Sequence, residues 1–203
     1  MISRTDKAFT ALGSLRSGVF YMKNCKIALL TVLSIWLGSV SWADSEPDLP
    51  SYITASEHGQ FYFKLVPDPS YDREKGAGIC FEVIAGETDK ILWKTAGWYS
   101  LQVYLSEDGE YLARMGHWPR GQDVSPEDLA VAFYKKGELL KSYSTMDLIK
   151  DSSSVERTLS HYSWIKGEPV YKSSENQLII VTTENIEYTF DMTSGEILNQ
   201  RKL

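Results

Sequence analysis

One short turn sequence occurs three times along the chain, each time just before a run of apolar residues. The copies read S-E-H-G-Q-F at 56–61, S-E-D-G-E-Y at 106–111 and S-E-N-Q-L at 174–178. Asp108-Gly109 supplies the positive φ angles that a tight hairpin requires. A further apolar run and a charged turn follow each copy. The chain is therefore predicted to consist of repeated antiparallel strand units.

Strand-like runs fill most of the chain after residue 55. Aromatic residues make up 12% of the sequence, and aromatic and β-branched residues favour strands. The alternation stops only at 145–161, which suits two short helical turns, at 147–149 and 155–159. We therefore expect an all-β domain with one short helical insertion. The predicted strands cover residues 60–66, 78–85, 90–93, 101–105, 110–115, 129–134, 138–143, 177–183, 186–191 and 196–198.

The second unit is the most complete. It reads W-Y-S-L-Q-V-Y-L-S-E-D-G-E-Y-L-A-R-M-G-H-W at 98–118 and D-L-A-V-A-F-Y-K-K-G-E-L-L-K-S-Y at 128–143. With its S-x-D-G-x-Y turn and the following G-x-L strand, the chain resembles the blades of β-propeller proteins of the quinoprotein or YVTN type. The resemblance implies twisted antiparallel repeat units in a propeller-like or incomplete propeller arrangement.

The number of units departs from that family. A closed propeller needs at least four blades, whereas the repeated turn marks three units. Three units imply an open or incomplete array, a β-sandwich-like stack, or a ring closed by another chain.

The N-terminal region has the order of a secretory signal peptide. Residues 27–40 are apolar and uncharged, Lys23 and Lys26 precede them, and Ser41-Trp42-Ala43 follows. A basic start, a short apolar run and small residues at a cleavage site define such signals. The run is shorter than the roughly 20 residues of a membrane-spanning helix. An uncleaved signal anchor is the alternative.

These features divide the chain into four parts. Residues 1–21 are interpreted as an N-terminal extension that is not native, and 22–43 as the signal peptide. Residues 44–55 are an extended lead-in, and 56–203 form the β-repeat domain. Cleavage after Ala43 predicts a secreted or periplasmic protein.

Charge and motifs exclude several function classes. Residues 1–43 hold five basic and one acidic residue, so the mature chain has 21 − 5 = 16 basic and 27 − 1 = 26 acidic side chains, a net charge of −10. This balance argues against nucleic acid and anionic lipid as partners. We find no nucleophile, phosphate-loop or metal-ligand motif, so no catalytic residue, metal or cofactor is predicted. Cys80, the lone mature cysteine, is expected to be buried and inert.

Aromatic and histidine side chains at strand ends and in loops are the candidate ligand-binding residues. Such groups can form a sugar- or peptide-binding platform when exposed. The alternative is that they fill the space between twisted sheets. The candidates are Trp98, Tyr99, His117, Trp118, His161, Tyr162 and Trp164.

The sequence favours an extracytoplasmic, non-enzymatic binding or association domain. One alternative is a small secreted hydrolase with acids and His161 beside an aromatic cleft; another is a membrane-tethered envelope protein that keeps its signal. A protein partner or self-association is expected, because an open array exposes strand edges. The predicted edges are 60–66 and 196–198. Membrane contact is expected only if the signal is uncleaved.

Overall fold

The computed structural model describes residues 48–203 except 71, 73–74 and 118. The predicted extension and signal peptide, 1–21 and 22–43, lie outside these residues. The described residues belong to one compact unit, Asp44–Leu203.

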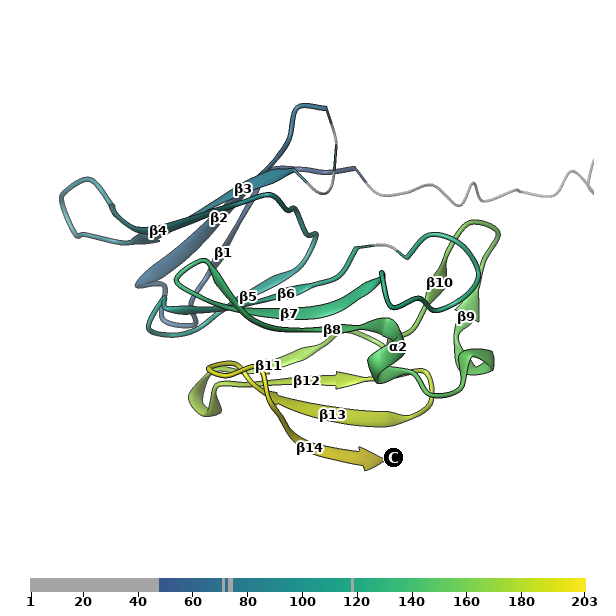
Figure 1. Cartoon of the computed structure of the whole chain (residues 1–203). Coiled ribbons are helices and arrows are strands. Elements are labelled where there is room, and N and C mark those ends of the chain that lie inside the picture. Colours follow the sequence, from purple (N-terminus) through teal and green to yellow (C-terminus); the bar gives the residue numbers. More distant parts are fainter. Residues whose placement is uncertain (1–47, 71, 73–74, 118) are drawn as a thin grey trace, which may run out of the picture. The chain divides into compact units, whose positions relative to one another are not determined.

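The unit contains three four-stranded antiparallel sheets in which neighbouring strands are consecutive in the sequence (Figure 1). Hairpin connections allow this order, because antiparallel neighbours can be joined by short turns. Sheet 1 consists of β1 (Tyr52–Ala55), β2 (Phe61–Pro67), β3 (Gly76–Glu82) and β4 (Lys90–Ala96). Sheet 2 consists of β5 (Val103–Leu105), β6 (Tyr111–Met115), β7 (Leu129–Lys135) and β8 (Glu138–Ser144). Sheet 3 consists of β11 (Val170–Lys172), β12 (Gln177–Val181), β13 (Ile186–Asp191) and β14 (Ile197–Lys202).

The expected fold class is therefore confirmed: the protein is all-β and built from repeated, propeller-like antiparallel units. The described residues do not close these units into a ring. The structure corrects two details of the sequence interpretation. Residues 52–55, assigned to the lead-in, form the first strand of sheet 1. The predicted edge 60–66 is wrong, because β2 pairs with both β1 and β3, so that β1 is the edge.

A helical insertion follows sheet 2, as expected. Helix α2 (Thr145–Leu148) begins with a capping box, in which Ser144 and Asp147 bond each other's backbone N–H groups. The predicted second helical turn at 155–159 is wrong. In its place lie a 3-10 turn, η1 (Ser152–Ser154), and a two-stranded ribbon of β9 (Glu156–Arg157) and β10 (Tyr162–Ser163). A second 3-10 turn, η2 (Ser173–Glu175), joins β11 to β12.

Sheet 2 is the middle layer, with sheet 1 on one face and sheet 3 on the other (Figure 1). Residues 130–134 of β7 are all buried. Ala132 and Tyr134 belong to the core shared with sheet 1, while Val131 and Phe133 belong to the core shared with sheet 3. A strand covered on both faces reads as a continuous apolar run rather than an alternating one.

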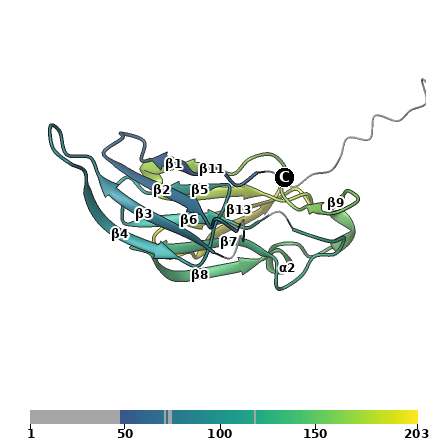
Figure 2. The same cartoon turned by 90° about the horizontal axis from the view of Figure 1, so that it is seen from above.

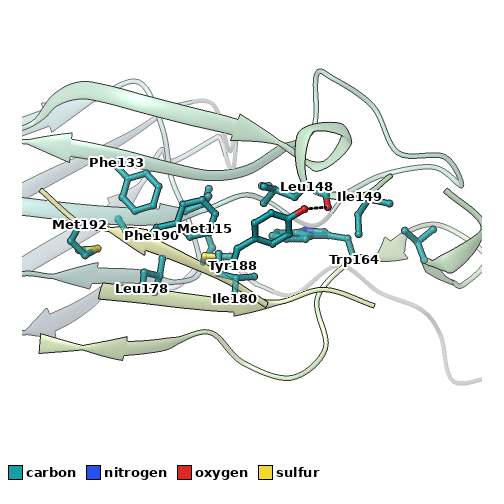
Figure 3. Packing of buried hydrophobic residues seen from close by; sticks show 14 of the residues in the cluster. Met115, Phe133, Leu148, Ile149, Trp164, Leu178, Ile180, Tyr188, Phe190 and Met192 are labelled. Atoms are coloured by element: carbon teal, nitrogen blue, oxygen red, sulfur yellow. Dashed lines mark hydrogen bonds between the residues drawn. The ribbon is translucent and has the colours of Figure 1, made fainter. Parts of the chain in front are cut away.

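Figure 3 shows the core between sheets 2 and 3. Phe133 packs against Phe190 with ring centroids 5.4 Å apart. The hydroxyl of Tyr188 donates a hydrogen bond to the carbonyl of Leu148, at 2.9 Å (Figure 3). This bond attaches helix α2 to sheet 3.

The repeated turns have common geometry. The N–H of Gly59 donates to the carbonyl of Ser56, and that of Gly109 to Ser106, with positive φ angles of 70° and 68° at the two glycines. In the third turn the N–H of Asn176 donates to Ser173, and φ of Asn176 is 51°. The third repeat therefore begins at Ser173, one residue earlier than the sequence comparison placed it.

Corresponding strands of the three sheets lie on the same side. In Figure 2 β1, β5 and β11 lie together, and β4 and β8 lie on the opposite side. A propeller blade has the same order, with its first strand innermost and its fourth outermost. The three sheets therefore have the same orientation in the stack, as successive blades of a propeller would have.

Candidate functional site

The seven residues predicted to bind a ligand occupy different environments. Trp98, Tyr99, Tyr162 and Trp164 are buried, with at most 7% of each residue exposed. His117 and His161 are half-buried. Trp118 lies outside the described residues.

Trp98 and Tyr99 fill the space between sheets 1 and 2. The Trp98 ring lies 6.1 Å from that of Phe63 in sheet 1 and 5.4 Å from that of Tyr134 in sheet 2. The Tyr99 hydroxyl donates to the carbonyl of Pro50 at 2.7 Å. For these two residues the core alternative describes the structure.

A pocket of about 240 Å³ brings the other four described candidates together. It lies where β5 begins and β6 ends, next to β10 and the residues that follow it. His117 and His161, 44 residues apart (161 − 117), both line it. The lining residues are Leu101, Gln102, Met115, Gly116, His117, Pro119, His161, Tyr162, Ser163, Trp164 and Ile165.

Several polar groups of this pocket are engaged in internal hydrogen bonds. His161 Nδ1 lies 2.6 Å from Thr158 Oγ1. The Tyr162 hydroxyl donates to Asp128 Oδ2 at 2.6 Å and lies 2.8 Å from Thr145 Oγ1. Burial, and then the bond to the carboxylate, raise the pKa of Tyr162 far above its usual range. The Tyr162 hydroxyl therefore stays protonated at neutral pH. Its contacts with Asp128 and Thr145 hold the segment that contains α2 and β10 against sheet 2.

The hydrolase alternative places acidic side chains beside His161. Its described lining residues include two histidines and a serine but no aspartate or glutamate. The Ser163 hydroxyl donates to the Ile165 carbonyl at 3.2 Å and not to a histidine. Among the described residues no group of three or more His, Cys, Asp or Glu side chains could hold a metal ion.

Sequence reasoning missed a second feature, the outer face of sheet 1. Residues such as Phe63, Leu65 and Cys80 point toward sheet 2, so the alternate residues point away from it. Across the strands they form three rows: Ile53, Lys64, Ile79 and Lys94; Ala55, Tyr62, Phe81 and Ile91; and Val66, Ala77 and Ala96. We call these eleven residues the sheet 1 outer face.

This face is mostly apolar and exposed. Ile53 is 59% exposed and Ile91 48%. Tyr62 and Phe81 stack on it with ring centroids 4.8 Å apart. Lys64 and Lys94 are the two charged members of the rows. A cavity of about 350 Å³ lies beside Ile79, where the neighbouring side chains are small. It is lined by Ala77, Gly78, Ile79, Lys94, Thr95 and Ala96.

The corresponding face of sheet 3 is more polar. Its rows are Val170, Ile179, Thr189 and Asn199; Lys172, Gln177 and Asp191; and Val181, Glu187 and Arg201. Arg201 donates two hydrogen bonds to Glu187, at 2.7 and 3.0 Å. These bonds hold the pKa of Glu187 below its usual value, so its carboxylate is ionised at neutral pH. We call these ten residues the sheet 3 outer face.

The repeated turns meet at one end of the three sheets. Glu107 of sheet 2 accepts hydrogen bonds from the backbone N–H groups of Glu57 and His58, at 2.8 and 3.1 Å. The Ser173 hydroxyl donates to Glu57. Burial raises the pKa of Glu107, but the hydrogen bonds from His58 and Glu57 outweigh it and hold the pKa below its usual value. The turns therefore link the sheets and have a structural role.

No helix among the described residues is long and apolar enough to span a membrane. No protein family and no curated protein matches the chain in sequence. Among solved structures, the Dos1 propeller is similar at 6% identity and a TM-score of 0.43, over 74% of this chain and 33% of that one. The C-terminal WD40 domain of Sif2 is similar at 12% identity and a TM-score of 0.28, over 78% of this chain and 40% of that one. The chain thus matches well under half the length of either structure.

Proposed function

We propose that the protein is an exported, non-enzymatic association domain that binds another protein chain through the sheet 1 outer face. The observation that carries this proposal is the apolar character of that face on a terminal sheet. The terminal units of repeat arrays usually have a polar outer surface. The sheet 3 outer face agrees with that rule, whereas the sheet 1 outer face departs from it.

The energetics of burial favour a covered face. Burying one large aliphatic side chain stabilises a complex by about 1.5–3 kcal/mol. Ile53 and Ile79 lie in one row and Phe81 and Ile91 in the next, so one partner surface can cover all four. Contiguous apolar patches on soluble proteins commonly mark interaction sites.

Export is the second part of the proposal, and it rests on the basic, apolar and small-residue order of residues 23–43. The N-terminus of the protein recovered from its destination should begin at Asp44, as read by N-terminal sequencing. A protein that keeps residues 27–40 and needs detergent for extraction would refute cleavage.

Association through this face can be tested by photo-crosslinking in living cells. A photoreactive amino acid replaces Ile79 on the sheet 1 outer face or, as the matched control, Leu159, which is exposed and lies outside both outer faces. We expect a covalent adduct to a protein chain at position 79. If positions 53, 79 and 91 all fail to give an adduct, the association proposal is wrong.

A further inference from the structure

We propose that the sheet 1 outer face is covered by the sheet 3 outer face of a second copy, so that two copies form one closed ring of six sheets. This inference rests on the proposed function and names its partner.

The packing within one copy shows how such a contact is made. Sheet 1 packs on sheet 2 and sheet 2 on sheet 3, each time with the first strands β1, β5 and β11 on the same side (Figure 2). Sheet 3 of one copy placed on sheet 1 of the next repeats this arrangement a third time. The array then continues across the boundary between copies in the same strand order, with the more polar sheet 3 outer face on one side of the contact.

The number of copies follows from closure. Propellers typically contain about 4–8 blades. A ring built from copies that each supply three sheets contains a multiple of three, and six is the one multiple of three in that range. The contact between copies is head-to-tail, and such contacts form a ring when the rotation closes. Two copies therefore complete the ring.

The first two strands of each face present apolar side chains. Val170, Ile179 and Val181 lie on the first two strands of sheet 3, and Ile53 and Val66 lie on the first two strands of sheet 1. These apolar strips occupy corresponding positions in a head-to-tail contact.

The charges favour the same arrangement. The rows of the sheet 1 outer face carry Lys64 and Lys94, and the Tyr62 hydroxyl donates to Asp89 Oδ2 at the margin of the face, at 2.8 Å. The sheet 3 outer face is neutral in sum, because the carboxylates of Glu187 and Asp191 are matched by Lys172 and Arg201, so it adds no net positive charge opposite the two lysines. In a symmetric contact between two sheet 1 outer faces, four lysines would share one interface, and like charges there are unfavourable.

The first test measures the mass in solution of the protein purified after expression of the full chain. Light scattering should give two copies per particle. Lys64→Glu combined with Lys94→Glu should weaken the dimer at least tenfold, with unchanged circular dichroism. Lys166→Glu makes the same kind of charge change outside both faces and should leave the mass unchanged.

The second test identifies the faces by disulfide crosslinking. Ile53 on β1 and Val170 on β11 are exposed and lie on first strands, and Cys80 is buried. A mixture of the Ile53→Cys and Val170→Cys variants should form a disulfide-linked pair of chains. Either variant alone should not, because the two equivalent positions are far apart in a six-sheet ring.

Three outcomes of these two tests would contradict the ring. A protein that is monomeric at all concentrations, that forms open polymers, or that crosslinks through Ile53→Cys alone contradicts it. If the purified protein is a monomer while position 79 crosslinks to a different protein in cells, the ring is wrong and the association function stands. If positions 53, 79 and 91 all give no adduct, both proposals are wrong.

Discussion

Gly109 connects the repeated turn to the core between sheets 1 and 2. Its carbonyl accepts hydrogen bonds from Trp93 Nε1 at 2.7 Å and from Cys80 Sγ at 3.4 Å. Burial raises the pKa of the Cys80 thiol to about 12, as expected for an inert cysteine. A Cβ atom at residue 109 would lie 2.8 Å from the Phe61 ring. The turn is therefore a packing element of the core.

We predict that Gly109→Ala destabilises the protein more than Gly59→Ala. Both glycines have positive φ, which costs an alanine about 1 kcal/mol, but the added methyl group at residue 59 meets no atom within 4 Å. The contact with Phe61 should add about 1–3 kcal/mol of overpacking cost at residue 109. Urea unfolding of the two variants measures the difference. Equal losses would show that Phe61 moves aside without cost.

Glu107 gives the link between the turns a predictable pH dependence. Its folded-state pKa lies below the ordinary value, so as pH falls the unfolded chain takes up the proton first. Its stabilising contribution is present at neutral pH and is lost as pH falls below about 4.3 toward the folded-state pKa. We predict that Glu107→Gln lowers stability at pH 7 and that the difference from the native protein shrinks at pH 3. A difference that is constant between these pH values would contradict this role.

At the scale of elements, the insertion depends on one buried tyrosine. The Tyr162 hydroxyl on β10 bonds Asp128, before β7, and contacts Thr145 at the start of α2. It therefore joins three segments that are separate in the sequence.

We predict that Tyr162→Phe costs about 1–3 kcal/mol, because it leaves a hydrogen-bonded carboxylate without its donor. Tyr143→Phe is the matched control, since that hydroxyl bonds one neutral carbonyl, of Gly195, at 3.0 Å, and should cost about 1 kcal/mol. Thermal unfolding compares the two. A smaller loss for Tyr162→Phe than for the control would contradict the proposed role of Tyr162.

Strand runs and the helical insertion were predictable because their patterns are local. β1 was missed because it is short and follows a proline-containing segment. The predicted helical turn at 155–159 failed because long-range contacts decide that segment: Arg157 bonds the carbonyls of Gln122 and Ser152, and Val155 is buried in the core. Of the predicted ligand-binding residues, His117, His161, Tyr162 and Trp164 line one pocket, and ligand binding there stays a prediction.

The sheet 1 outer face could not be predicted in the same way. The alternation in β2 and β3 is weak, because both faces carry apolar residues, and a pattern does not tell which face a neighbouring sheet covers. The position of Ile79 opposite Lys64 and Lys94 follows from strand register, which depends on pairing across the whole sheet.

At the scale of the whole molecule, the two ends of the stack differ. Sheet 3 presents an ion pair and polar side chains to solvent, whereas sheet 1 presents isoleucines and stacked aromatic rings. The proposed two-copy ring predicts that stability depends on concentration, because association stabilises the folded protein by mass action.

We predict that the melting temperature rises with protein concentration. A hundredfold increase should add about 2.7 kcal/mol of stability per dimer, which is about 1.4 kcal/mol per chain, and so raises the melting temperature by several degrees. Calorimetry at several concentrations measures this shift. The Lys64→Glu, Lys94→Glu double variant is the control. At each concentration it should melt at a lower temperature than the native protein, because its dimer is weaker. A flat response of the native protein would contradict the ring.

The consecutive order of strands in each sheet also has a kinetic consequence. All pairings within a sheet join neighbours in the chain, and such local contacts form quickly. Sheet 1 can therefore assemble while later residues are still being synthesised. Its inner side chains, such as Phe63 and Leu65, have no cover until β5–β8 follow. Sheet 3 is synthesised last and completes the monomer. Sheet 1 is synthesised first, and its outer face is the one proposed to bind a partner.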